Sequence, residues 1–156
     1  MDLILWRHAE AEDGEPGEPD ARRKLTTKGQ KQARRMAEWL DAQLPETTEI
    51  LVSPALRTQQ TVEALDRRVK TINDIASGCE PEAVLKAANW PSARKPVLVV
   101  GHQPTLGQVA ALLLTGSPQY WNVKKGNVWW ISQRDPDDPD SIYLKAVMGP
   151  DLILKP

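Results

Sequence analysis

The two histidines of the chain occupy equivalent places in the sequence. His8 ends the run LILWRH and His102 ends the run PVLVVGH, and short apolar runs of this kind are typical of buried strands. In open α/β sheets, ligands bind outside the carboxyl ends of the strands. A third apolar run, in ILVSPALR, brings Arg57 toward the same edge, and Arg7 adjoins His8. The sequence therefore predicts that two histidines and two arginines meet in one crevice.

These four side chains suit a phosphoryl group. A phosphate monoester carries roughly −1.5 to −2 charges near neutral pH, and arginine binds two of its oxygens with a planar fork of donors. His102 stands just before an expected helix, whose backbone N–H groups and dipole add positive potential. One neutral histidine could attack phosphorus while the other, protonated, binds an oxygen, and this needs no metal. The residues alone leave open which histidine attacks.

A metal site is the rival use for two histidines. Together with a carboxylate such as Glu10 they could bind zinc, but the chain has no HExxH motif and no comparable ligand spacing. The neighbouring arginines would also repel a cation. We therefore expect neither a metal nor a cofactor.

The elements that must position these residues alternate between strands and helices. Strands are expected at residues 2–7, 49–53 and 96–101, with a weak one near 69–72. Helices are expected from Thr27 to Leu44, from Ser53-Pro54 onward, from Pro81 onward and directly after residue 101. Residues 127–132 and 141–147 flank a turn-rich loop and predict an antiparallel hairpin. This alternation favours an α/β fold with a mostly parallel sheet covered on both faces.

The bulk composition is typical of one globular domain, expected to span residues 1–156. Hydrophobic residues make up 40% and charged residues 26% of the chain, and the net charge of −1 argues against a nucleic-acid partner. Cys79, the only cysteine, excludes an internal disulfide. The apolar N-terminal run is too short for a signal peptide, and no run approaches the roughly 18 residues of a membrane span. We expect a cytoplasmic monomer that binds no membrane.

Four ordered motifs resemble those of the histidine phosphatase superfamily. They are Arg7-His8-Ala9-Glu10, Leu25-Thr26-Thr27-Lys28-Gly29, Ser53-Pro54-Ala55-Leu56-Arg57-Thr58 with Gln60-Thr61, and Gly101-His102-Gln103-Pro104. They extend over residues 2 to about 115. The RHAEAE opening, the LTxxG motif and the short length are most similar to the SixA-type phosphohistidine phosphatases.

The resemblance implies a phosphoglycerate mutase-like fold, a three-layer α/β/α sandwich whose mostly parallel central sheet carries a C-terminal antiparallel hairpin. In the superfamily the histidine of the N-terminal RH motif is the nucleophile, and that role carries over to His8. The arginine beside it, the arginine of the SPxLR segment and the late histidine form the phosphate pocket, which assigns Arg7, Arg57 and His102. The implied substrate is a phosphohistidine-containing protein, such as a histidine phosphotransfer domain.

The larger superfamily members usually add an acidic proton donor for the leaving alcohol. Asp74 and Glu80 lie in the corresponding region, but neither belongs to a recognisable motif. An alkoxide is very basic, on the scale of bulk water at about 15.7. A histidine leaving group has a conjugate-acid pKa of about 6.5 and takes its proton from solvent. The missing donor therefore favours phosphohistidine over phosphate esters.

Three points stay open on the sequence alone. The same pocket could serve a phosphatase of small phosphate esters. It could also belong to a phosphate- or phosphoprotein-binding module without catalysis, although all four pocket residues are present. The acidic, proline-containing loop at 11–24 should border the crevice and could select substrates, but we interpret it as solvated surface.

Overall fold

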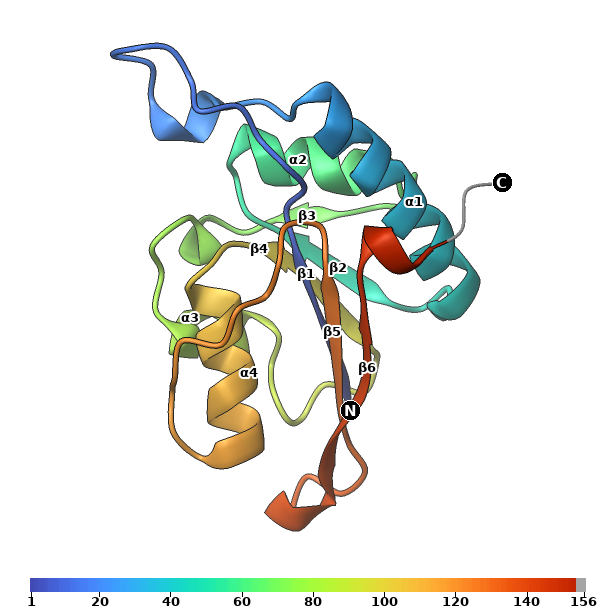
Figure 1. Cartoon of the computed structure of the whole chain (residues 1–156). Coiled ribbons are helices and arrows are strands. Elements are labelled where there is room, and N and C mark those ends of the chain that lie inside the picture. Colours follow the sequence, from blue (N-terminus) through green and yellow to red (C-terminus); the bar gives the residue numbers. More distant parts are fainter. Residues whose placement is uncertain (154–156) are drawn as a thin grey trace.

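The apolar runs of the sequence form one mixed sheet in the computed structural model, which describes residues 1–153. The strand order is β3-β2-β4-β1-β5-β6 (Figure 1). The strands are β1 (Asp2–Arg7), β2 (Glu49–Val52), β3 (Lys70–Thr71), β4 (Val97–Gly101), β5 (Val128–Gln133) and β6 (Ile142–Met148). The predicted strands, including the weak one near 69–72, are confirmed.

Strand pairing brings the carboxyl ends of three strands to the same edge of the sheet. β1 and β4 are parallel neighbours, with Arg7 opposite Gly101. β4 also pairs in parallel with β2, with Val52 opposite Val100. The hairpin of β5 and β6 then adds to the other side of β1 in antiparallel orientation. The residues that follow β1, β2 and β4 must therefore lie close together.

Helices cover both faces of the sheet because the strand side chains are apolar on both sides. Ile4 and Trp6 of β1 face the core under α1 (Thr27–Gln43) and α2 (Leu56–Glu63). Leu3 and Leu5 face the core under α3 (Pro81–Ala87) and α4 (Thr105–Thr115). All four side chains are fully buried. The expected three-layer α/β/α sandwich is confirmed (Figure 1).

Short 3₁₀ turns complete the connections. They are η1 (Asp20–Arg22), η2 (Asn73–Ile75), η3 (Pro139–Ser141) and η4 (Pro150–Leu152). Within the described part of the chain, every helix is too short or too polar to cross a lipid bilayer.

The start of α2 differs from the prediction. Ser53-Pro54 was expected to begin the helix, but Ala55 is the N-cap and Leu56 the first helical residue. The Ser53 hydroxyl accepts a bond from the backbone N–H of Ala55 at 3.3 Å and lies 2.7 Å from Nε2 of His102. The Ser53 hydroxyl therefore contacts His102, which directly follows the neighbouring strand β4, and the helix begins three residues later at Leu56.

Candidate active site

The four predicted residues line one small hollow at the carboxyl ends of β1, β2 and β4. Its volume is about 210 Å³, and Arg7, His8, Arg57 and His102 all contribute to its wall. The two imidazole rings lie 5.4 Å apart, centroid to centroid, at an interplanar angle of 56°. Parallel register places His8 and His102 side by side, since each directly follows one of two paired strands.

The imidazole of His8 has a defined tautomer. Its Nδ1 lies 2.7 Å from the carbonyl oxygen of Ala9, and a carbonyl only accepts, so Nδ1 carries the proton. Burial, and then the positive charges of Arg57 and Arg7, lower the pKa of His8 to about 4 despite the opposing bond to Ala9. At neutral pH the ring is uncharged, and Nε2 carries a free lone pair. His8 thus has the form that an attacking imidazole requires.

His102 is buried and neutral in this structure. Burial, followed by the positive charge of Arg57, lowers its pKa to about 3. This differs from the expectation of a protonated second histidine, because burial first and the nearby charge of Arg57 second disfavour a charged ring. Among residues 1–153, its Nδ1 is buried without a hydrogen-bond partner. The neutral ring therefore has one nitrogen left over for a hydrogen bond with a ligand.

Arg57 lies inside the site and is not the solvated helix residue that its position in α2 would allow. It is 2% exposed. Its Nη1 donates to the backbone carbonyl of Asp20 and its Nη2 to the Asp20 carboxylate, both at 2.9 Å. Asp20 also accepts from Nε of Arg23 at 2.9 Å. Burial raises the pKa of Asp20, but the bonds from Arg23 and Arg57 outweigh this and lower the pKa below its usual value, so the carboxylate is ionised at neutral pH.

Arg7 extends from the last position of β1 and is half-buried. Its Nη1 donates to the carbonyl of Val123 at 3.0 Å. Burial and the nearby charge of Arg57 lower its pKa, but arginine keeps its charge in proteins. The Nε atoms of Arg7 and Arg57 are both buried without a partner.

The residues that carry unpartnered buried atoms all line this hollow. Across residues 1–153, the buried side-chain nitrogen and oxygen atoms without a partner are three, and they belong to Arg7, Arg57 and His102. Buried polar groups are normally hydrogen-bonded, so three unpaired nitrogens at one site indicate a place for a ligand with several oxygens. A tetrahedral oxyanion fits this requirement.

Several residues at the hollow were not singled out from the sequence. Asp20 and Arg23 come from the 11–24 loop, Lys125 comes from the turn before β5, and Ser53 contacts His102. The expectation that the 11–24 loop borders the crevice is confirmed, because Ala11, Asp13, Asp20 and Arg23 line the hollow. Most of the loop is also exposed, so the loop is solvated surface and part of the wall at once. The one available signal for Asp20 was that a buried Arg57 would need a carboxylate partner.

The other candidate carboxylates lie outside this hollow. Asp74 and Glu80 are exposed and do not line it. The carboxylate of Glu10 accepts a bond from the Thr26 hydroxyl at 2.7 Å. In the described residues, no three side chains of the kinds that ligate metals gather at one place.

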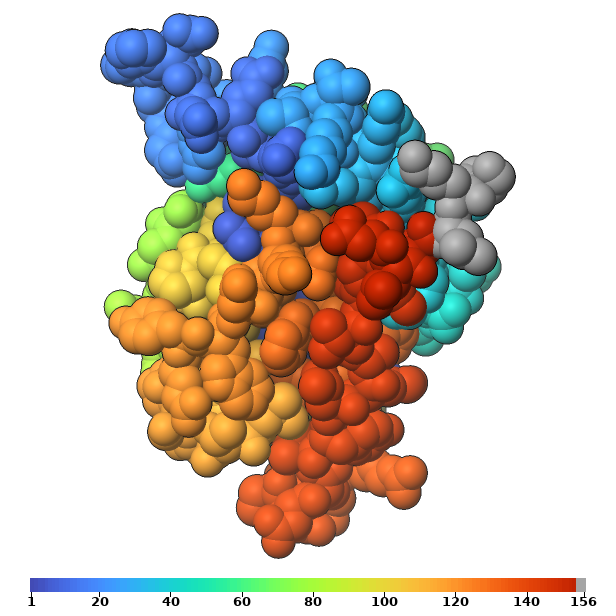
Figure 2. Space-filling model, in the orientation of Figure 1, coloured from blue at the N-terminus to red at the C-terminus, as the bar shows by residue number. Residues whose placement is uncertain are grey.

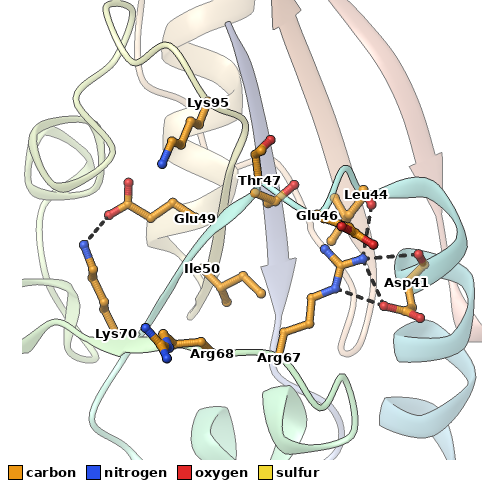
Figure 3. Close-up of a pocket in the computed structure, with 11 residues that line it drawn as sticks. Asp41, Leu44, Glu46, Thr47, Glu49, Ile50, Arg67, Arg68, Lys70 and Lys95 are labelled. Carbon is orange, nitrogen blue, oxygen red and sulfur yellow. Dashed lines mark hydrogen bonds and ion pairs between the residues drawn. The ribbon is translucent and has the colours of Figure 1, made fainter.

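A larger hollow, of about 670 Å³, lies at the opposite edge of the sheet, near the amino ends of β2, β3 and β4 (Figure 3). Four of its charged residues form two ion pairs, Arg67 with Asp41 and Lys70 with Glu49, both at 2.9 Å. Its lining contains no histidine, cysteine or serine that could act as a nucleophile. The smaller hollow, which contains His8 and His102, is therefore the candidate active site.

Known proteins share both sequence and fold with this chain. The family model of the histidine phosphatase superfamily (branch 1) matches residues 3–77. Phosphohistidine phosphatase SixA of Escherichia coli is 33% identical over 129 residues, which span 74% of this chain and 76% of that protein. The SixA homolog of Haemophilus influenzae is 32% identical over 132 residues, 72% of this chain and 77% of that protein. A solved structure of the protein histidine phosphatase SixA complexed with tungstate has a TM-score of 0.78 at 24% identity, covering 97% of this chain and 98% of that one. The chain belongs to the histidine phosphatase superfamily.

Proposed function

We propose that this chain is a phosphohistidine phosphatase that works through a phosphorylated His8. The observation that carries the proposal is the neutral His8 ring, with its Nδ1–H bound to Ala9, beside unpaired nitrogens of Arg7, Arg57 and His102. The names of its relatives in Escherichia coli and Haemophilus influenzae support this substrate class.

The reaction takes two displacement steps. In the first, Nε2 of His8 forms a bond to phosphorus as the P–N bond to the substrate histidine breaks, and the leaving imidazole takes a proton from solvent. In the second, water attacks the phosphoenzyme, inorganic phosphate leaves, and neutral His8 is restored. Arg7, Arg57 and His102 bind the phosphoryl oxygens in both steps, so catalysis rests on positioning and on charge neutralisation.

The carboxylates near the site support a histidine leaving group. Asp20 is ionised and bound to two arginines, which makes it a poor proton donor. Asp74 and Glu80 are exposed elsewhere on the surface. A leaving imidazole needs no enzymatic acid, because its conjugate acid has a pKa of about 6.5. The substrate we propose is therefore a phosphorylated protein, such as a histidine phosphotransfer domain.

One observation favours a second candidate, a phosphatase of small phosphate esters. Asp13 lines the hollow and, among residues 1–153, forms no ion pair, so it is a carboxyl group within reach of a leaving alcohol. A panel of sugar and alkyl phosphates tested beside a phosphohistidine protein separates the two. Rapid ester turnover without release of phosphate from the protein would overturn our proposal.

The direct test uses the whole chain without added metal. The wild type is incubated with a phosphohistidine-containing protein, and phosphate release is followed. We expect His8→Ala to lower the rate by at least roughly a thousandfold, as loss of a nucleophile does in other enzymes. Acid-labile phosphate should be trapped on the wild type and not on the variant. A wild type that binds the phosphoprotein but never becomes phosphorylated would be a binding module.

A further inference from the structure

A second hollow adjoins the phosphate pocket and is rich in lysine. Its volume is about 330 Å³. Arg7 and Lys125 belong to the walls of both hollows, while Lys28 and Lys124 line only the second. We call Lys28, Lys124 and Lys125 the lysine ledge. Because the two hollows share Arg7 and Lys125, the ledge lies directly beside the place where a substrate would present its phosphoryl group to His8.

The ledge carries positive charge that the rest of the protein leaves largely unneutralised. Across residues 1–153, none of its three lysines lies within ion-pair distance of a carboxylate. The acidic residues in the same wall are Glu10 and Asp151. Glu10 is engaged by the Thr26 hydroxyl. An excess of basic side chains therefore faces solvent beside the catalytic hollow.

The backbone under Lys124 and Lys125 is fixed to the strand that ends in His8. The indole Nε1 of Trp6 donates to the carbonyl of Gly126 at 3.1 Å. The N–H of Gly126 donates to the carbonyls of Arg7 and His8, at 3.2 and 3.0 Å. These bonds hold the turn at a constant position relative to the attacking imidazole.

Lys28 is anchored from the other side of the hollow. It lies in the first turn of α1, where the Thr26 side chain accepts from the N–H of Gly29 at 2.9 Å. The N–H of Thr26 donates to the carbonyl of Glu10 at 3.0 Å, just after β1. In Figure 2 orange and red segments lie side by side on the visible face, and residues of the turn before β5 and of η4 line the same hollow. The backbone that carries the ledge is thus fixed on both sides of the hollow.

Building on the proposed function, we propose that the lysine ledge binds acidic side chains next to the phosphohistidine of the substrate protein. Complementary charge across an interface speeds association and fixes orientation. The loop at 11–24, which also contributes to the wall of the phosphate pocket, carries five acidic and three basic residues and so has no comparable excess of positive charge. An acidic partner surface is therefore attracted to the ledge and not to the loop, which gives the partner one preferred orientation.

The test compares charge-reversed variants on matched peptides. Lys28→Glu/Lys124→Glu changes the ledge without touching any residue of the phosphate pocket. Arg68→Glu/Lys95→Glu makes the same change in net charge among exposed residues of the hollow at the opposite edge of the sheet (Figure 3). The substrates are phosphohistidine peptides flanked by glutamate or by alanine, and free phosphohistidine.

We expect the wild type to favour the glutamate-flanked peptide by about 10-fold in kcat/KM, on the scale of a few exposed ion pairs. The preference should shrink in 0.5 M salt. The ledge variant should lose it and still hydrolyse free phosphohistidine normally, while the control variant should behave as wild type. A wild type without preference, or a ledge variant that keeps it, would overturn the inference.

Peptide binding separates this inference from the proposed function. Fluorescence anisotropy measures the Kd of each labelled peptide without requiring turnover. If the wild type hydrolyses no phosphohistidine substrate, the proposed function fails, but a glutamate preference in Kd that the ledge variant lacks still supports the ledge. Equal Kd values for both peptides would rule the ledge out whatever the activity.

Discussion

At the scale of single residues, the hollow that we propose binds phosphate contains an anion of its own. The carboxylate of Asp20 lies 2.9 Å from Nη2 of Arg57, a guanidinium that is almost fully buried. A buried charge is costly without a partner, so Asp20 stabilises Arg57 while no phosphate is bound. The same carboxylate opposes an incoming phosphoryl dianion, because it is a like charge on the same arginine.

The first prediction concerns this contact. We expect Asp20→Asn to tighten the binding of inorganic phosphate about fivefold, the scale of one like charge removed at about 4 Å in water-like surroundings. Calorimetric titration measures the Kd directly. Asp13→Asn is the matched control, since Asp13 lines the same hollow without an ion pair to Arg57, and it should have a smaller effect. Weaker phosphate binding in Asp20→Asn would mean instead that Asp20 positions Arg57.

At the scale of elements, the turn before β5 supports the end of β1. Gly126 has a φ of 77°, a conformation that side-chain-bearing residues rarely adopt. A Cβ there would meet only ordinary contacts, with Pro150 at 3.5 Å and Gln32 at 3.7 Å. Glycine is therefore required at position 126 by its positive φ, since a Cβ would find enough room there.

The second prediction follows from that requirement. We expect Gly126→Ala to lower the free energy of unfolding by about 1–2 kcal/mol, the cost of a left-handed conformation. It should also lower kcat, because relaxation of the turn moves the N–H that binds the carbonyls of Arg7 and His8. Urea unfolding and phosphohistidine turnover measure the two effects.

Gly17→Ala provides the control. Gly17 has a φ of 81°, and nothing lies within 4 Å of its Cβ position. The exposed loop around it can relax, so we expect a smaller loss of stability and unchanged kcat. If both variants lowered kcat equally, the turn before β5 would have no special role in positioning His8.

At the scale of the whole molecule, folding places two histidines in a buried, positively charged site. Burial comes first, and the arginine charges second, in lowering the pKa of His8 to about 4 and of His102 to about 3. In the unfolded chain both rings would titrate near 6.5. The unfolded state therefore binds more protons than the folded state between pH 6.5 and the folded pKa values.

The third prediction is the resulting pH dependence of stability. Because the unfolded state takes up more protons in that window, the free energy of unfolding should fall as the pH drops from 7 toward 4. Urea unfolding at a series of pH values measures it. The double variant His8→Gln/His102→Gln should show a flatter profile between pH 4 and 6.5. An equally steep profile in that variant would assign the effect to other groups.

The sequence alone was enough to predict the strands, the layers and the meeting of Arg7, His8, Arg57 and His102. Apolar runs are local signals, and residues that directly follow parallel strands must share one edge of the sheet. His8 and His102 were predictable for this reason, since β1 and β4 are neighbours.

Only the tertiary structure decided the state of the site and its surroundings. The neutrality of both imidazoles depends on burial and on arginine charges from other elements, which no local pattern encodes. Asp20 reaches Arg57 across 37 positions of sequence, through a loop whose composition indicates only surface. Contacts between segments far apart in the chain arise from packing, so the counter-ion of the pocket and the lysines beside it became visible only in the folded molecule.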